Sequence, residues 1–168
     1  METTKNKLSP ETKQFFDKLS SYLDTKLYFY GSVQRDDYFD GKSDIDVDIF
    51  TSDEKGTMLK LQEFLRIDSF KQVVNRMHTT NKIVYGHKVK YNKGGINAEF
   101  SIYNEQNKEN VLREHNSKSV LPFFISVLLI ILKFVYYRLY ILPTRIYIYL
   151  KNMIMNSVNN YEAKFVIY

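Results

Sequence analysis

Apolar and polar positions recur along the chain in two different periods, which predict a mixture of helices and strands. Ser9-Pro10-Glu11 is typical of a helix N-terminus, and apolar residues then follow at helical spacing: Phe15, Phe16, Leu19, Tyr22 and Leu23. A second helix is predicted to begin at Ser52-Asp53-Glu54, and the pattern is again helical from about Lys108 onward. Strands are predicted at Leu27–Tyr30, Asp44–Phe50, Phe70–Met77, Lys82–Tyr91 and Ile96–Tyr103.

The connections between these elements define the class. Gly94-Gly95 is predicted to turn the chain between the last two strands, which makes an antiparallel hairpin. Because helices and strands are mixed and hairpins are expected, we predict an α+β fold with a mixed, mostly antiparallel sheet flanked by helices.

Composition limits the classes of protein. A chain of 168 residues with 44% hydrophobic residues can bury a core, which excludes wholesale disorder. The absence of cysteine excludes disulfides, thiolate zinc sites and cysteine nucleophiles. After residue 115 the chain has six of its 24 basic residues, the last of them Lys164, but only one of its 19 acidic residues, Glu162. The net charge of +5 therefore lies in the last third, which indicates a negatively charged partner or a membrane surface.

The segment Asp44 to Phe50 carries the most informative pattern. Asp44, Asp46 and Asp48 alternate with Ile45, Val47 and Ile49, so a strand would place all three carboxylates on one face. Carboxylates this close repel one another unless a cation lies between them, and Mg²⁺ prefers such oxygen ligands together with substrate phosphates. The pattern predicts a cation site, and the alternative is a solvated acidic strand.

A possible phosphate cradle precedes this strand. The predicted strand Leu27–Tyr30 ends in Gly31-Ser32, where backbone N–H groups and a hydroxyl can meet a phosphate. Glycine also allows a close approach or a positive φ angle. Alone, Gly-Ser is usually a turn, but it becomes specific when it precedes an Asp-x-Asp strand by about a dozen residues.

Together, Gly31-Ser32 and Ser43-Asp-Ile-Asp-Val-Asp resemble the motifs of the DNA polymerase β-like nucleotidyltransferase superfamily. This superfamily includes poly(A) and terminal uridylyl polymerases, oligoadenylate synthases and minimal nucleotidyltransferases. The resemblance implies the nucleotidyltransferase fold, with Gly31 and Ser32 on the nucleotide phosphates and Asp44 and Asp46 on two divalent ions. It also implies a phosphate contact for Arg35, with a surface arginine as the equal alternative.

The resemblance further implies a third carboxylate from a later strand, and Glu99, between Ala98 and Phe100, is the candidate. Glutamate replaces the usual aspartate, and the alternative is a solvent-facing strand residue. Asp48 is ranked lower, as an outer ligand. Asp44, Asp46 and Glu99 would hold two Mg²⁺ ions, with Mn²⁺ as the substitute, for transfer of NMP from an NTP to a hydroxyl.

The segment from Val120 to Pro143 is apolar and has three interpretations. The favoured one is a buried helix packed on the sheet; the alternatives are a membrane-spanning and an interfacial helix. The stretch around Lys133 resembles a helix of polyadenylating members in which a lysine contacts the triphosphate, so Lys133 is the candidate, with a snorkelling lysine as the alternative. His78, His87 and His115 lack ligand spacing and are predicted to be surface or loop residues.

We therefore expect residues 1–115 to form a catalytic domain and residues 116–168 a basic, Tyr-rich helical extension packed on it. The expected function is Mg²⁺-dependent nucleotidyl transfer from an NTP, with RNA or another polyanion as a candidate acceptor. The alternatives are a catalytically weak nucleotide-binding module and a small membrane-associated protein anchored by residues 120–142. The polar first 30 residues contain no signal-peptide pattern, which predicts a cytoplasmic location.

Overall fold

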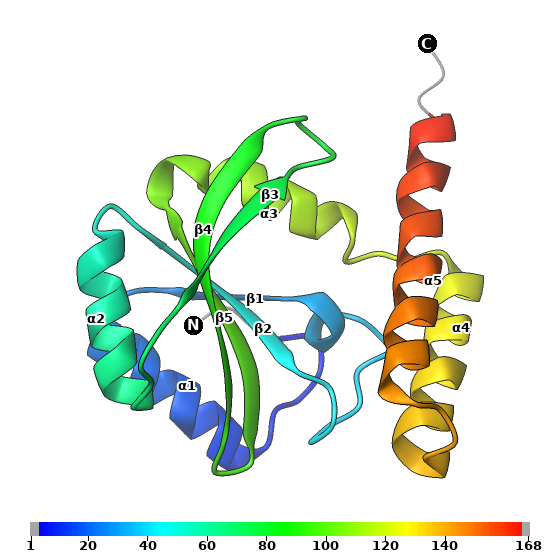
Figure 1. Cartoon of the computed structure of the whole chain (residues 1–168), viewed down its shortest axis with the longest axis horizontal. Helices are drawn as coiled ribbons and strands as arrows, with labels where there is room; N and C mark the ends of the chain where they lie inside the picture. Colours follow the sequence, from blue (N-terminus) through cyan, green and yellow to red (C-terminus); the bar gives the residue numbers. More distant parts are fainter. Residues whose placement is uncertain (1–3, 166–168) are drawn as a thin grey trace.

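A five-stranded sheet forms the centre of the molecule (Figure 1). Its strands are β1 (Leu27–Tyr30), β2 (Ile45–Thr51), β3 (Lys71–Arg76), β4 (Ile83–Lys93) and β5 (Ile96–Asn104). In space they follow the order β1-β2-β5-β4-β3, and only the β2–β5 pair is parallel. The computed structural model describes residues 4–165, and the side chains of residues 4–158. Glu162 and Lys164 of the basic tail lie outside the described side chains.

One face of the sheet is covered by α1 (Pro10–Leu23) and α2 (Glu54–Leu65). Ser9 caps α1 by accepting a hydrogen bond from the Thr12 N–H, and Asp53 caps α2 in the same way. The main core lies between these helices and β1, β2 and β5, and it includes Phe16, Leu19, Val47, Ile49, Leu61, Phe100 and Ile102. The predicted Ile-Val-Ile face of β2 is therefore the core face, and Asp46 and Asp48 project from the opposite face.

That opposite face is covered only in part. The helix α3 (Lys108–Ser117) packs its Val111 into a smaller cluster with Tyr28, Phe50, Met77, Val84 and Tyr103. The mixed sheet with flanking helices confirms the predicted α+β class.

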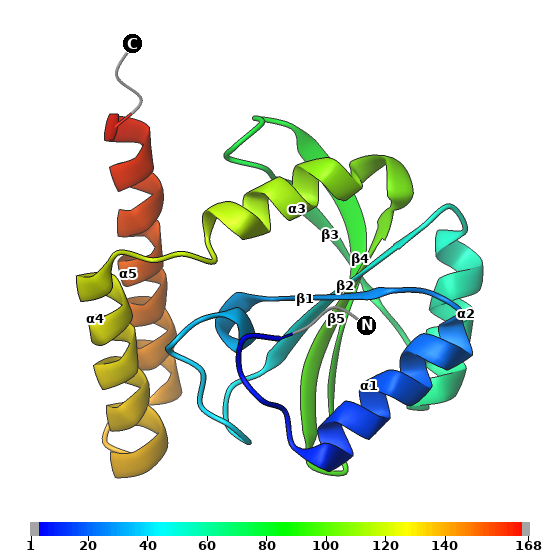
Figure 2. The ribbon, with the colours of Figure 1, turned by 180° about the vertical axis from the view of Figure 1, so that it is seen from behind.

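The helices α4 (Phe123–Phe134) and α5 (Thr144–Phe165) lie side by side at one side of the sheet, as the two opposite views agree (Figures 1 and 2). A π-helical turn at Val135–Leu139 and Tyr140, with a φ of 55°, end the first helix. Ile125, Leu129 and Val158 form the small core between the two helices.

The predicted burial of this apolar segment against the sheet is wrong for much of its surface. Phe123 is 84% exposed and Val120 is 80% exposed, because α4 packs mainly on α5 and leaves its outer face uncovered. Within the described part of the chain, none of the helices combines the length and apolar character that crossing a bilayer requires.

Candidate nucleotide-binding site

A cavity of about 240 Å³ opens on the acid-bearing face of the sheet. It brings together five residues that the sequence nominated: Gly31, Ser32, Arg35, Asp44 and Asp46. Its other lining residues come from β1, α3, the residue after α3 and α5: Tyr30, His115, Lys118, Lys151 and Met155. The cavity therefore joins the predicted phosphate cradle and acid pair to cationic side chains from the last third of the chain.

Gly31 forms the closest part of this site. It follows β1 directly, begins a 3-10 turn (Gly31–Gln34) and has a φ of 71°, which L side chains rarely adopt. A Cβ atom at this position would collide with the carboxylate of Asp46. The glycine is thus needed both for the turn and for the close approach of the acid. Beside it, Ser32 is buried and its side chain lines the same cavity.

Asp46 lies where several negative charges meet. It pairs in register with Tyr30 of β1 and Glu99 of β5. Burial raises the pKa of Asp46 to about 7, assisted by the nearby Asp44 and Glu99 carboxylates, while Lys151 and Lys88 act against the rise. A carboxylate held in this way gains from any cation that enters the cavity.

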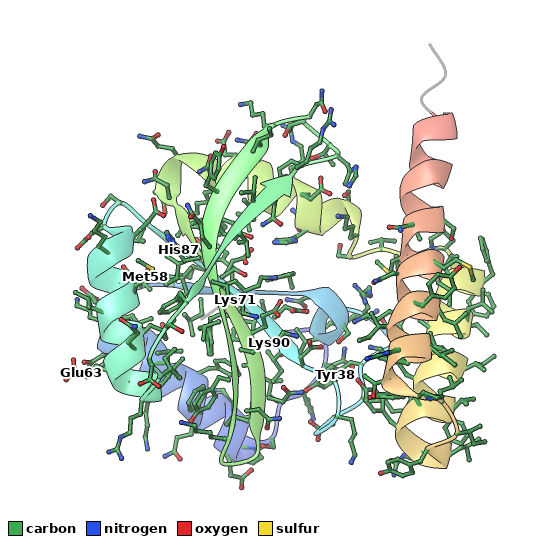
Figure 3. The ribbon with its side chains drawn as sticks, viewed as in Figure 1. Tyr38, Met58, Glu63, Lys71, His87 and Lys90 are labelled. Carbon is green, nitrogen blue, oxygen red and sulfur yellow. The ribbon has the colours of Figure 1, made fainter. Side chains whose placement is uncertain are left out.

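Glu99 lies beside Asp46 in the sheet, but it is paired with lysines. Its two carboxylate oxygens lie 2.7 Å from Lys88 Nζ and 3.4 Å from Lys90 Nζ. Burial alone would raise the pKa of Glu99, but the two lysines bring it below its ordinary value. Lys90 can be followed in Figure 3, where in this view it lies over the sheet between α2 and the α4–α5 pair.

Arg35 and Lys133, both nominated as phosphate contacts, meet at one buried carboxylate. Arg35 Nε lies 2.8 Å from Asp37 Oδ1, and Lys133 Nζ lies 2.8 Å from Asp37 Oδ2. Lys133 also donates to the Asp37 carbonyl, at 2.7 Å, and to Ser43 Oγ, at 3.4 Å. Lys133 is 1% exposed and is not among the cavity lining. In this arrangement it ties α4 to the loop that leads into Asp44.

The carboxylates at this cavity suit a divalent cation only in part. Asp44 and Asp46 line one cavity and repel each other, which suits a cation with oxygen ligands. Across residues 4–158, no three His, Asp or Glu side chains are arranged as a ready metal site. The aspartate pair thus fits a divalent ion, whereas Glu99 would first have to leave Lys88 and Lys90.

Sequence reasoning missed three residues at this cavity. The sequence analysis includes Lys118 and Lys151 only as members of the basic tail, and it predicts that His115 is a surface or loop residue. All three line the cavity. Their sequence signal was the excess of positive charge after residue 115, which does not identify individual side chains. The prediction for His115 is wrong because its ring stacks on Tyr30, with centroids 3.8 Å apart, and its Nε2 lies 2.7 Å from Asp48 Oδ2.

Asp48, the third aspartate of the strand, is fully buried. Burial raises its pKa, and the neighbouring His115 acts in the opposite direction. Asp48 and His115 both line a second cavity, of about 350 Å³, which adjoins the first around Tyr30 and Gly31. Asp48 therefore lines only the second cavity, whereas His115 lines both.

The chain resembles known proteins in structure and in sequence. The chain is similar in structure to a cytoplasmic RNA terminal U-transferase, with 17% identity, a TM-score of 0.43, and coverage of 76% of this chain and 40% of that one. It is also similar to Cid1, described as an RNA terminal uridylyl transferase, with 17% identity, a TM-score of 0.41, and coverage of 79% and 41%. The chain thus spans about 40% of the length of these solved structures. No curated protein matches it significantly.

A family model also matches the chain in sequence. Residues 10–112, which run from α1 into α3, match the model described as "Nucleotidyltransferase domain". This segment includes the Gly31-Ser32 turn, both cavity aspartates and Glu99. The match covers more than half of the chain, and it agrees with the resemblance on which the sequence prediction rests. The chain therefore belongs to the nucleotidyltransferase domain family.

Proposed function

We propose that this protein transfers a nucleoside monophosphate from an NTP to an acceptor hydroxyl in the 240 Å³ cavity. The observation that carries the proposal is the convergence of Gly31, Ser32, Asp44 and Asp46 on one side of that cavity with Lys118 and Lys151 on another. A triphosphate needs both backbone donors and cations, and a divalent ion needs carboxylates.

In the proposed reaction, the acceptor oxygen forms a bond to the α-phosphorus of the NTP. The bond from this phosphorus to the oxygen that bridges to the β-phosphate breaks, and pyrophosphate leaves with that electron pair. The proton of the acceptor hydroxyl passes to solvent. Gly31 and Ser32 would orient the phosphates, and Lys118 and Lys151 would offset the charge of the departing pyrophosphate.

Asp44 and Asp46 would hold Mg²⁺, or Mn²⁺ in its place, with Glu99 completing the set after release from Lys88 and Lys90. When bound, the ions would activate the hydroxyl and neutralise phosphate charge. Arg35 lines the cavity and could turn from Asp37 to a phosphate oxygen. Lys133 could contact a phosphate only after leaving Asp37. Its position favours a different role, in which it holds the loop before Asp44 in place.

The acceptor is proposed to be a polyanion such as RNA. Lys71 and Lys88 pair in register across β3 and β4, and Lys90 pairs with Glu99 on the same face of the sheet. These lysines continue the positive charge of the cavity outward along the sheet, and phosphates are their natural counterions. In this proposal residues 1–115 are the catalytic domain, and residues 116–168 are its cationic wall.

The test is transfer of label from each of the four α-labelled NTPs, with Mg²⁺ or Mn²⁺, to RNA, protein and small-molecule hydroxyls. Wild-type protein should label at least one acceptor, and the double variant Asp44→Asn with Asp46→Asn should label none while keeping its fold. Asp17→Asn, on the exposed surface of α1, is the matched control and should behave as wild type. Full labelling by the double variant would refute the site.

One observation favours a second candidate, a nucleotide-binding module with little turnover. Both oxygens of Glu99 are paired with lysines, so the third carboxylate is not free for a cation. This candidate predicts that NTPs raise the melting temperature, because binding to the folded state alone is stabilising, without transfer to any acceptor. The double variant Lys88→Gln with Lys90→Gln would then free Glu99 for a cation. Transfer by this variant, but not by wild-type protein, would show that the two lysines prevent the reaction.

A further inference from the structure

The Asp48–His115 pair has no role in the function proposed above. Asp48 is fully buried at the centre of the sheet, and His115 Nε2, 2.7 Å from its Oδ2, is its one ion-pair partner among the described residues. In the described part of the chain neither Asp48 carboxylate oxygen has a hydrogen-bond partner of regular geometry, and the same holds for His115 Nε2, so their 2.7 Å contact is a close charge–dipole or ion-pair contact. A buried carboxylate with so little compensation is costly, so the N–H edge of the neighbouring ring is its main stabilising contact.

The His115 ring is held in a fixed orientation. It stacks on Tyr30 with centroids 3.8 Å apart and an interplanar angle of 14°. It lies in the last turn of α3, a helix end at which a cationic ring is favoured. Its Nε2 is buried against Asp48, while Nδ1 has no hydrogen bond to any described residue and is not among the buried atoms. The second nitrogen is therefore open to the adjoining space.

His115 lines two adjoining cavities, and one of them is the candidate nucleotide site. His115 lines the same cavity as Gly31 and Ser32, and Lys118, three residues further along the chain, lines it as well. An imidazolium carries N–H donors on both nitrogens, so a ring whose Nε2–H faces Asp48 can offer Nδ1–H to an anion. A hydrogen bond between a cationic donor and a phosphate oxygen is a strong one.

We propose that His115 binds a phosphate oxygen of the nucleotide through Nδ1–H, and that Asp48 and Tyr30 are positioning residues that fix the orientation of its ring. This inference rests on the proposed function, because it takes the cavity as the nucleotide site. Asp48, the third aspartate of the strand, then has a role different from that of Asp44 and Asp46, because it acts through His115.

The experiment compares His115→Phe with wild-type protein. Phenylalanine keeps a flat ring on Tyr30 but removes both N–H donors and leaves Asp48 unpaired, so binding is compared only after circular dichroism has shown that the variant is folded. Affinity for inorganic tripolyphosphate, measured by calorimetry, should fall about tenfold or more. His78→Phe, at an exposed histidine, is the matched control and should bind as wild type. His115→Asn places an amide donor near the position of Nδ1 and should recover part of the affinity.

A purely structural role for His115 predicts a lower melting temperature and unchanged tripolyphosphate affinity in the folded His115→Phe variant, and that result would overturn the inference. In the transfer assay, KM for the NTP should rise more than kcat falls. Asp48→Asn should raise KM by a smaller factor, because it loosens the contact that orients the His115 ring without removing the donor. Equal KM values in wild-type protein and both variants would also overturn it.

The outcomes separate the two proposals. If wild-type protein binds tripolyphosphate through His115 but transfers no nucleotide, the proposed function fails and the phosphate contact stands. If wild-type protein transfers nucleotide and His115→Phe binds tripolyphosphate normally, the contact fails and the function stands.

Discussion

The sheet domain and the α4–α5 pair contribute to the same cavity, but they bury apolar side chains very differently. Fifteen buried residues from α1, α2, the sheet and the turn after β1 make one continuous core behind Asp46. Among the described side chains, the cluster between the two helices of the pair has three buried residues, while Phe123 and other large apolar residues of α4 remain exposed. The acids are therefore positioned by tight packing. The helix pair contacts the sheet domain through the buried Lys133–Asp37 ion pair and the ring contact of Tyr137 with Phe39.

The largest expected effect follows from breaking that polar link. Lys133→Met would leave the buried Asp37 with Arg35 alone, and removal of one partner from a buried ion pair costs roughly 3–5 kcal/mol. Chemical denaturation should show this loss. Lys13→Met, which breaks the exposed Lys13–Asp17 pair, should cost less than about 1 kcal/mol. Similar losses in the two variants would contradict the comparison.

A second prediction concerns the charge that the sheet domain tolerates at Asp46. In the folded protein its pKa is about 7 against an ordinary 3.8, so folding favours the protonated acid. The metal-free protein should therefore lose stability as the pH rises from about 4 to 7. Asp46→Asn removes that loss and should raise the free energy of unfolding at pH 8 by on the order of 2–4 kcal/mol.

The advantage of Asp46→Asn should shrink as the pH falls from about 7 toward 4, because the folded-state carboxyl is then protonated, and it should vanish at pH values below 3.8, where the carboxyl is protonated in both states. Urea titrations of the two proteins at pH 4.5 and pH 8, with chelator present, measure the difference. A variant less stable than wild type at pH 8 would contradict the assigned charge repulsion among Asp44, Asp46 and Glu99.

A third prediction tests the close approach of Gly31 to Asp46. Gly31→Ala introduces a Cβ into the Asp46 carboxylate at a φ of 71°, and should cost roughly 1–3 kcal/mol as well as most of the transfer activity. Gly41→Ala is the matched control, since Gly41 has a φ of 66° with no atom near its missing Cβ. It should lose stability by backbone strain alone and keep its activity. Equal activity in the two variants would remove Gly31 from the site.

The smallest effect is expected from the helix pair's own charge. Lys151→Ala should raise KM for the NTP severalfold, because Lys151 lines the cavity and opposes the rise in the pKa of Asp46. Steady-state kinetics measure this change. Arg145→Ala, on the exposed surface of the same helix, is the control, and an equal rise in KM there would mean that only net charge matters.

The same contrast explains what the sequence could predict. The strict alternation of Asp44 to Ile49 determined both the core face and the acid face of β2, because strand geometry is local. The Gly31-Ser32 turn was recognisable for the same reason. His115, Lys118 and Lys151 reach the cavity only through the packing of α3 and α5 beside the sheet, and no local pattern encodes that arrangement. The exposed face of α4 and the Lys133–Asp37 pair likewise depend on tertiary contacts.

The most direct test of nucleotidyl transfer in this cavity is the ratio of pyrophosphate released to NMP incorporated, measured in one reaction with labelled NTP and Mg²⁺. The proposal predicts one pyrophosphate for each NMP transferred by wild-type protein, and neither product from the Asp44→Asn, Asp46→Asn double variant. Release of orthophosphate, or release of pyrophosphate without incorporation into any acceptor, would identify a hydrolase and contradict the account.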